Sequence, residues 1–369
     1  MDIIRDENGL VVKITMRKPV DMHQHLRTGP MLKMVAPMVA KRFRAAIIMP
    51  NTVPPITNLS RVHRYAEEIL NATGPGFHPL MTLYLTDTLR PSEVGLLFKM
   101  EMIHGIKYYP RGLTTNSDRG VKSPSSLWTL GTNPYECLQV LAEHGGVLLL
   151  HAADGFDENR VELDPYDQER HFIEHTLPRI RDAHPTLKIS VEHLSTKWGV
   201  EYLLKHGGPL LGCSLTAQHL LLDRRDSFRG GFHPHRFWWP IIQPTEHREA
   251  LRELAKSDLP FVWLGSDSAP HTIDKKESGC CCGGVLMAHA GIELYAEAFE
   301  DMGALDDRFE RFASINGARF YGIEDSDETI SLVREEWTVR NPYRIADNGT
   351  SKEVVPFRLG EKVRWKLAT

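Results

Sequence analysis

The chain has 369 residues, of which 41% are hydrophobic, 25% charged and 8% aromatic. This composition is ordinary for a soluble globular protein, and the length is within reach of a single α/β barrel. The formal net charge of −4 and the lack of any apolar run near ~20 residues argue against nucleic-acid-binding and membrane-spanning proteins.

The N-terminal segment and the cysteines indicate a cytoplasmic protein. Three acidic residues lie within the first seven, whereas secretory and organelle-targeting segments are apolar-cored or rich in arginine. Three of the five cysteines are adjacent, at Cys280–Cys282, which is not a disulfide framework and lacks the C-x-x-C spacing of a zinc knuckle. We therefore expect a chain that works in a reducing compartment.

Eight short apolar runs bounded by turn residues predict β-strands. Most are continuously apolar, which is typical of parallel strands that are covered on both faces. In chain order they are Pro19–His25, Ala45–Asn51, Met81–Asp87, Gly105–Tyr109, Val147–His151, Lys188–His193, Pro209–Thr216 and Phe261–Asp267.

Helical patterns separate these runs, and another follows the last of them. Eight βα units within roughly 280 residues match a (β/α)8 TIM-like barrel. The alternative is a doubly wound open sheet, whose nucleotide-binding forms lose support because no glycine-rich phosphate loop follows an early strand. The expected helices are Met31–Phe43, Leu59–Asn71, Pro91–Lys99, Pro134–His144, Gln168–Asp182, Lys197–His206, Glu246–Lys256 and Leu286–Phe299.

We expect a single domain over residues 1–369, with the barrel at about 18–326. The flanks, 1–17 and 327–369, are expected to add small β extensions that cover or plug the barrel ends. The β-like runs of these flanks are Leu10–Met16, Trp337–Val339 and Glu353–Arg358.

Two connections are unusually long, Pro110–Asn133 and Ala217–Gln243. Loops of this length in compact domains are commonly lids or binding loops. We expect both to lie at the functional end of the barrel.

Potential metal ligands recur at the carboxyl ends of the predicted strands. These ends converge on one face of a barrel, and an H-x-H pair at a strand end aims two imidazoles the same way. Four histidines and a carboxylate exceed the three protein ligands of a mononuclear catalytic zinc, which indicates two metal ions. The residues are His23, His25, His151, His193 and Asp267.

Lys107 lies at the end of the fourth predicted strand, among these ligands. An ammonium group has no lone pair and would repel a metal. A strand-end lysine can bind phosphate or carboxylate, or, if it is buried and neutral, can react with CO₂ to give a carbamate that binds two metals. The residues alone leave both readings open.

His171 and His175 are four residues apart on a predicted helix. The glutamate of an H-E-x-x-H motif is missing, so we expect surface residues rather than a zinc site.

Several motifs follow one another along residues 21 to about 285 in a characteristic order. They are Asp21–Arg27, Met49–Thr52, Gly105–Pro110, Thr114–Asn116, His151–Ala152, Val191–His193, Gln218–Leu220 and Gly265–His271. The combination of D-x-H-x-H-x-R with G-S-D-S-A-P-H is highly specific. The set resembles the compact, monofunctional dihydroorotases of the amidohydrolase superfamily.

The resemblance implies a binuclear zinc centre, with Co²⁺ or Mn²⁺ as alternatives. One metal would be bound by His23, His25 and Asp267, and the other by His151 and His193. Lys107 would be carbamylated (N6-carboxylysine) and would bridge the two metals together with a hydroxide.

The resemblance also implies three kinds of substrate contact. Arg27, Asn51 and His271 would hold the substrate carboxylate, and the backbone near Trp239 and Gly283 would contact the ring amide. Thr114 and Thr115 would lie at the tip of a loop that closes on the bound substrate. Family members often have a smaller aliphatic residue in place of Trp239 and an alanine in place of Gly283, which would alter the shape of the pocket.

The implied activity is the reversible hydrolysis of (S)-dihydroorotate to N-carbamoyl-L-aspartate in de novo pyrimidine biosynthesis. Asp267 would act as general base and then as general acid. The only partners expected are a small-molecule substrate and a second copy of the chain in a homodimer, with no nucleic acid and no membrane.

Two other functions are kept as alternatives. Another cyclic-amide hydrolase, such as a hydantoinase or dihydropyrimidinase, is disfavoured by Arg27 and His271, because its substrates lack the carboxylate that these residues would hold. A non-catalytic scaffold on the same fold is disfavoured because every expected metal ligand is present.

Overall fold

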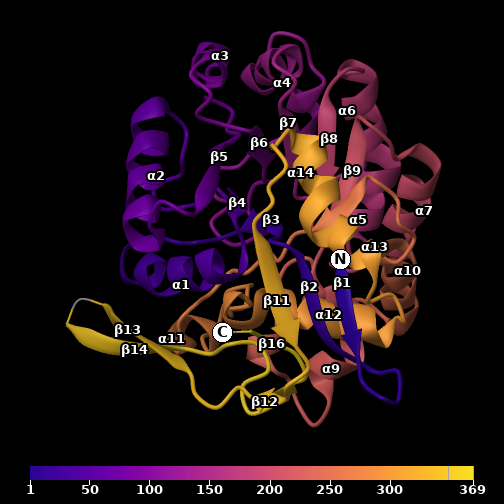
Figure 1. Ribbon diagram of the computed structural model, residues 1–369. Helices are drawn as coiled ribbons and strands as arrows, with labels where there is room; N and C mark the ends of the chain where they lie inside the picture. The colour runs from indigo at the N-terminus through magenta and orange to yellow at the C-terminus, as the bar shows by residue number, and fades with distance from the viewer. Residues whose placement is uncertain (348, 369) are drawn as a thin grey trace.

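The computed structural model describes residues 1–347 and 349–368, and its centre is a barrel of eight parallel strands (Figure 1). Each strand pairs with the next one along the chain, so the order in the barrel is the order in the sequence. The strands are β3 Val20–Gln24, β4 Ala45–Ile48, β5 His78–Tyr84, β6 Gly105–Tyr108, β7 Val147–Leu150, β8 Lys188–Val191, β9 Leu211–Leu215 and β10 Val262–Leu264.

The barrel closes where β3 and β10 meet, at their carboxyl ends. Gln24 bridges to Ser268, the His25 N–H donates to the Ser268 carbonyl over 3.2 Å, and the Asp267 N–H donates to the His23 carbonyl over 2.9 Å. The predicted barrel is therefore confirmed, and the open-sheet alternative is wrong. All eight predicted strands are present, although several expected ligands lie one to three residues beyond the strand ends.

Helices surround the barrel, and seven of the expected ones appear within a few residues of their predicted bounds. The helix expected over Gln168–Asp182 is divided by a π-helical turn, Phe172–Thr176. The helix expected from Leu286 begins only at Gly291, because Leu286 bridges to Pro356 instead. The α-helices are α1 Gly29–Arg42, α2 Leu59–Thr73, α3 Pro91–Lys99, α4 Asn133–Glu143, α5 Gln168–His171, α6 Leu177–Ala183, α7 Lys197–His206, α8 Ala217–Leu221, α9 Arg224–Phe228, α10 Thr245–Ala255, α11 Ile273–Lys276, α12 Gly291–Asp301, α13 Asp307–Glu310 and α14 Asn316–Tyr321.

The interior of the barrel is filled at its amino end. Alternate strand residues such as Met22, Ile47 and Leu149 form a separate buried cluster there, together with Trp263 and the last turn of α14. The rings of Trp263 and Phe320 lie 4.6 Å apart. Because α14 plugs this end, only the carboxyl end of the barrel is left for a site.

The two flanks of the chain pair with each other in a four-stranded sheet, rather than plugging an end of the barrel. Strands β1 Asp2–Arg5, β2 Val11–Arg17, β11 Thr329–Val333 and β16 Lys366–Leu367 form it in that order. Its buried side chains, among them Ile14 and Leu332, join the outer core between barrel and helices.

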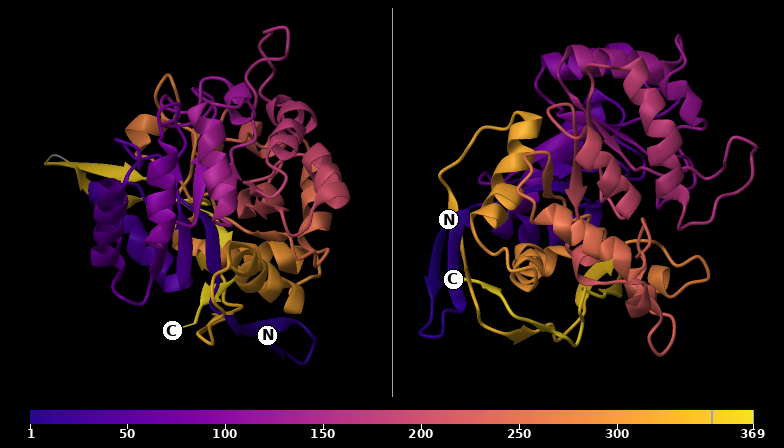
Figure 2. Two further views of the ribbon diagram at one scale, coloured as in Figure 1. Left: turned by 90° about the horizontal axis from the view of Figure 1, so that it is seen from above. Right: turned by 90° about the vertical axis from the view of Figure 1, so that its right-hand side faces the viewer.

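The remaining C-terminal strands are short. β12 Trp337–Thr338 pairs with β15 Lys362–Val363, and β13 Tyr343–Asp347 with β14 Thr350–Val354 in a hairpin that projects from the body of the molecule (Figures 1 and 2). The predicted runs at Leu10–Met16 and Trp337–Val339 are confirmed. The run at Glu353–Arg358 is wrong beyond Val354, where Pro356 cannot donate a ladder hydrogen bond. Among the helices of the described residues, none has the length and apolarity needed to cross a membrane.

Candidate metal centre

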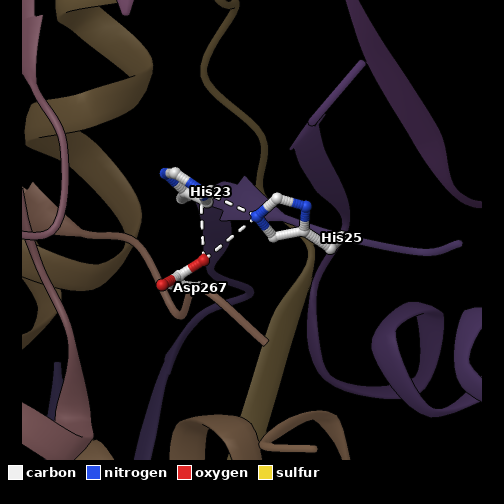
Figure 3. A group of neighbouring side chains, drawn as sticks. All are labelled: His23, His25 and Asp267. Atoms are coloured by element: carbon white, nitrogen blue, oxygen red, sulfur yellow. Dashed lines mark hydrogen bonds and ion pairs between the residues drawn. The ribbon is translucent and has the colours of Figure 1, made fainter. Parts of the chain in front are cut away.

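Three ligand-type side chains converge where the barrel closes (Figure 3). His23 Nε2 and His25 Nε2 lie 3.3 Å apart, and Asp267 Oδ1 lies 3.3 Å from the first and 3.1 Å from the second. All three residues are buried. Two imidazole nitrogens and a carboxylate oxygen are donors that zinc and similar divalent metals prefer.

The backbone around these ligands is held in an unusual conformation. Asp267 has φ +47° and His193 has φ +42°, in the left-handed region that non-glycine residues rarely occupy. The buried Asp21 carboxylate accepts hydrogen bonds from the Ser266 N–H at 2.8 Å and from its hydroxyl at 2.5 Å. Asp21 thus fixes the turn that presents Asp267, which gives a role to the first residue of the D-x-H-x-H motif.

A second pair of imidazoles lies beside the first group. His151 Nδ1 and His193 Nε2 face each other at 3.1 Å, and the His193 ring centre is 5.1 Å from that of His23. Burial lowers the pKa of His151 to about 3 and that of His193 well below its usual value. Both rings are therefore neutral at physiological pH, as metal ligation requires.

Lys107 lies fully buried on β6, and, together with burial, its charge lowers the pKa values of His151 and His193. Within residues 1–347 and 349–368, its Nζ has no hydrogen-bond partner. Burial lowers the pKa of Lys107 to about 8, although the charges of Glu192 and Asp267 act in the opposite direction. A lysine in this position is partly neutral near pH 8 and is available for reaction with CO₂.

Outer partners orient the first two histidines. His23 Nδ1 lies 2.6 Å from Glu192 Oε2, and His25 Nδ1 lies 2.8 Å from Asn51 Oδ1. These contacts engage Nδ1 and leave each Nε2 directed at the centre, the arrangement by which proteins fix the tautomer of a ligating histidine. Sequence reasoning missed Glu192 as a functional residue, although it directly precedes His193 in one of the motifs.

Charge at the centre favours an ionised Asp267. Burial alone would raise the pKa of Asp267, but the charge and hydrogen bond of His23 outweigh it and hold the pKa well below its usual range. For His25, burial dominates and lowers the pKa to about 4. Burial and the Lys107 charge would lower the pKa of His23, but the charge and hydrogen bond of Asp267 and the hydrogen bond to Glu192 outweigh them and raise it. The donor set is thus a carboxylate and four imidazoles, of which His23 must release its proton to bind a metal.

Most of the expected substrate contacts surround the same centre. A cavity of about 20 Å³ is lined by His23, His25, Arg27, Asn51, Tyr109, Thr114, Thr115, His151, His193, Trp239, Asp267, Ala269, Gly283 and Gly284. A larger cavity, of about 620 Å³, lies between α1 and α2 but contains none of the converging ligands. We therefore place the chemistry at the small cavity.

Arg27 lines this cavity, and the expected contact His271 lies beside Arg27 but is not part of the lining. Arg27 has φ +60°, its Nε donates to the Pro270 carbonyl over 3.2 Å, and its Nη2 is 3.0 Å from His271 Nε2. Burial and then the Arg27 charge lower the pKa of His271 to about 2, so His271 is neutral. A planar guanidinium and a neutral imidazole suit a carboxylate ligand.

The tip of the Pro110–Asn133 loop covers the cavity. The Asn51 amide donates to the Thr115 carbonyl over 3.2 Å, and the Thr115 hydroxyl donates to the Gly283 carbonyl over 3.0 Å. Asn116 reaches back to the Asn51 carbonyl over 3.1 Å. In this structure the loop is therefore closed, and both polar atoms of the Asn51 amide bind protein groups.

Trp239 and Gly283 are packed against each other. A Cβ atom added to Gly283 would lie 2.6 Å from Cδ1 of Trp239, a distance that real Cβ atoms do not show. The two departures from the family pattern are thus coupled, because the larger side chain at one position requires glycine at the other.

A second buried lysine, Lys276, joins the two segments that carry this pair. Its Nζ donates to the carbonyls of Phe237, Cys282 and Gly284 over 2.7, 2.9 and 2.9 Å. Sequence reasoning missed this residue, since the polar segment around it resembles an exposed loop.

Relatives are found along nearly the whole chain, although no protein-family model matches it. The dihydroorotase of Hahella chejuensis is 39% identical over 355 residues, covering 96% of this chain and 98% of the relative. The dihydroorotase of Marinobacter nauticus is 41% identical over 357 residues, covering 96% and 99%. The solved structure of the Saccharomyces cerevisiae dihydroorotase in complex with 5-fluoroorotic acid superposes with a TM-score of 0.87, at 29% identity, covering 97% and 99%.

A more distant structure shares the fold alone. The L-hydantoinase of Arthrobacter aurescens superposes with a TM-score of 0.75 over 96% of this chain and 83% of its own, at only 18% identity.

Proposed function

The chain belongs to the dihydroorotase family, and from this premise we propose that it catalyses the reversible hydrolysis of (S)-dihydroorotate to N-carbamoyl-L-aspartate, in de novo pyrimidine biosynthesis. The single observation that carries the proposal is the group of His23, His25 and Asp267, whose ligand atoms lie within 3.3 Å of one another inside a cavity that Arg27 also lines. Metal ligands and a carboxylate-binding cation are thus combined in one site.

The donors fit two divalent metal ions, for which zinc is proposed and Co²⁺ or Mn²⁺ would suit the same N/O set. His23, His25 and Asp267 would hold one ion, and His151 and His193 the other. When bound, the ions would supply hydroxide near neutral pH and polarise the amide carbonyl.

Carbamylated Lys107 would complete the centre by adding an anionic ligand for both ions. The burial of its Nζ, the lack of a hydrogen-bond partner among the described residues and a pKa of about 8 support this assignment. A charged ammonium at the same place would repel the metal ions, and the charges of Glu192 and Asp267 would offset it only in part.

Asp267 is the group proposed to move the proton. Hydrolysis breaks the ring C–N bond, adds a hydroxyl group to the carbonyl carbon and delivers a proton to the ring nitrogen. An ionised, buried carboxylate at the centre can accept the proton from the attacking water and pass it to the departing nitrogen, and the reverse sequence closes the ring.

The cavity walls are proposed to bind the substrate. Arg27 and His271, with Asn51, would hold the carboxylate, while backbone groups near Trp239 and Gly283 would contact the ring amide. Dihydroorotate carries one carboxylate and its product two, so a cationic site suits both. Thr114 and Thr115 would contact the substrate from the tip of the closed loop.

The same reasoning disfavours the alternatives. Hydantoins and dihydropyrimidines have no carboxylate for Arg27 and His271. A scaffold without activity would have no need for a buried lysine without a partner among five ligand side chains.

We propose one domain over residues 1–369, a homodimer as the family suggests, and a cytoplasmic location, which the five free cysteines support. Sedimentation of the purified chain tests the dimer.

The test of the function is removal of metal. Treatment with a chelator should abolish turnover of dihydroorotate, and two equivalents of Zn²⁺ per chain should restore it. The measurement is the rate at which carbamoyl aspartate forms before chelation, after it and after zinc is added back. Metal-independent turnover would refute the metal centre, and the absence of turnover in the zinc-loaded protein would refute the activity.

Lys107 provides the second arm of that experiment. With ¹³C-bicarbonate, the zinc-loaded protein should show a carbamate carbon signal that Lys107→Met loses. Lys276→Met is the matched control, because Lys276 is equally buried but engages three carbonyls, and it should keep the signal.

A further inference from the structure

Another group of ligand-type side chains lies outside the catalytic centre, at Glu158, His171 and His175. His171 ends α5, His175 lies in the π-helical turn that follows, and Glu158 lies in the loop after β7. Glu158 Oε2 is 3.5 Å from His171 Nε2, and Glu158 Oε1 is 3.2 Å from His175 Nδ1. The centres of the two imidazole rings lie 4.5 Å apart, and the ring planes are tilted by 31°. His171 Nε2 and His175 Nδ1 each face one oxygen of the Glu158 carboxylate.

A buried carboxylate orients the first of these histidines. Asp154 is 4% exposed, and its Oδ2 lies 2.9 Å from His171 Nδ1 and accepts a 2.8 Å hydrogen bond from the Thr176 hydroxyl. With Nδ1 engaged by Asp154, Nε2 points toward Glu158. A carboxylate behind an imidazole is the partner that metal-ligating histidines usually have, because it fixes the tautomer and raises the basicity of the ligand.

The electrostatic surroundings favour a cation. Residues 154–170 contain seven acidic side chains and two arginines. Of these arginines, Arg170 pairs with Glu174 and stacks on Trp198. A divalent ion at the group would therefore meet an excess of negative charge.

We propose that Glu158, His171 and His175 form a peripheral site for a divalent transition metal, with Zn²⁺ as its best-matched ion, separate from the catalytic centre. Two imidazoles select against Mg²⁺ and Ca²⁺, and three protein ligands leave a position for water. The bound ion replaces the proton that His171 otherwise shares with the carboxylates. It also ties the loop that carries Glu158 to the helix that carries both histidines.

Protons compete with the metal for this site. Burial lowers the pKa of His171, but the hydrogen bonds and charges of Asp154 and Glu158 outweigh it and raise the pKa. Binding should therefore be measured near pH 8, where the imidazole is more readily deprotonated.

The test counts zinc on the full chain after the catalytic centre has been loaded. Equilibrium dialysis against buffered Zn²⁺ should find one more equivalent on the wild type than on His175→Ala or Glu158→Gln. The extra zinc should also raise the unfolding temperature of the wild type and not that of either variant, because a ligand of the folded state stabilises it.

His63 provides a matched control. It faces Glu67, four residues further along α2, at 3.3 Å, but no second histidine joins this pair in a ligand group among the described residues. His63→Ala should bind as much zinc as the wild type. Asp154→Asn should weaken the extra site by about 10–100-fold without removing its ligands. Turnover of dihydroorotate should be unchanged in His175→Ala and Glu158→Gln.

Two results would overturn the proposal. If the wild type and both variants bind equal amounts of zinc, the group is an ion-pair network in which protons alone bridge the carboxylates. If His63→Ala loses the extra equivalent as well, zinc binds surface histidines without selection.

Discussion

Two buried lysines in this protein differ only in what surrounds their amino groups. Lys276 donates to three backbone carbonyls, so its charge is compensated and it acts as a structural clamp. The Lys107 amine has no hydrogen-bond partner in the described part of the chain, and its charge acts on the pKa values of His23, His151 and His193. A buried amine without a hydrogen bond is costly unless it becomes neutral or reacts, and that cost supports the proposal that Lys107 is the functional lysine.

At the residue scale, the packing of Trp239 against Gly283 makes a prediction about the pocket. Gly283→Ala places a methyl group 2.6 Å from the indole, which must displace the ring or the backbone that lines the cavity. We expect the KM for dihydroorotate to rise about tenfold, equivalent to ~1.4 kcal/mol of lost binding.

The double variant distinguishes this clash from a general defect. Trp239→Leu removes the obstructing ring, so Gly283→Ala combined with Trp239→Leu should recover most of the lost affinity, and steady-state kinetics of the four proteins give the coupling. Additive effects of the two substitutions would contradict the coupling.

At the scale of elements, the Pro110–Asn133 loop shows how a long connection acquires a task. Its tip is tied to two separate segments, to the end of β4 through Asn51 and to the connection between α11 and α12 through Gly283. Neither tie is strong alone, since a typical hydrogen bond contributes only about 1 kcal/mol. A loop held by a few such bonds can open and close on a catalytic timescale.

Thr115→Val removes the hydroxyl but keeps the size of the side chain, so it should shift the loop toward the open state. Loss of the 3.0 Å bond to the Gly283 carbonyl should lower kcat/KM about three- to tenfold, as expected for ~1 kcal/mol. Thr129→Val is the control in the same loop, because the Thr129 hydroxyl bonds only to the nearby Ser125 carbonyl and lies outside the cavity lining. Equal effects of the two substitutions would argue against a role for loop closure.

At the scale of the whole molecule, the C-terminal flank is docked onto the barrel around a buried histidine. His289 is 3% exposed and packs near the rings of Trp337 and Tyr343. Burial and the Arg42 charge lower the pKa of His289 to about 3. The folded protein therefore keeps this imidazole neutral at pH values where the unfolded chain binds a proton.

The pH dependence of stability follows from that difference. Neutral His289 contributes fully to the free energy of unfolding above the unfolded-state pKa of about 6.5. This contribution is lost as the pH falls toward 3, with about 2 kcal/mol lost by pH 5. Between pH 7.5 and pH 5, the free energy of unfolding measured in urea should fall less for His289→Gln than for the wild type. His78→Gln, at an exposed histidine, should follow the wild type, and parallel curves for all three proteins would contradict the assignment.

Much of the fold could be predicted from local patterns. Largely apolar runs identified all eight barrel strands, because a strand covered on both faces holds few polar residues. Of the polar exceptions, Asp21, His23 and Lys107 lie at the candidate metal centre. The flanks were predicted less well: β1, β11 and β13 were missed, because these four- or five-residue strands are only partly buried and show no continuous apolar run. The π-helical turn at Phe172–Thr176 was missed as well, because one inserted residue does not disturb an apolar pattern.

The sequence by itself determined the family, the barrel and which ligand types end its strands. H-x-H, a lysine and G-S-D-S-A-P-H are contiguous motifs, and the parallel barrel brings every strand end to one face whatever the details of packing. The roles assigned to these residues remain predictions that metal analysis and kinetics can test.

Only the tertiary structure decided the contacts between segments far apart in the chain. Glu192 orients His23 across 169 residues, Lys276 joins two loops, and Trp239 requires the glycine at position 283. Such contacts depend on distances of a few tenths of an ångström between side chains. A linear pattern carries residue type and spacing, but the close packing that sets those distances arises only when the barrel has closed.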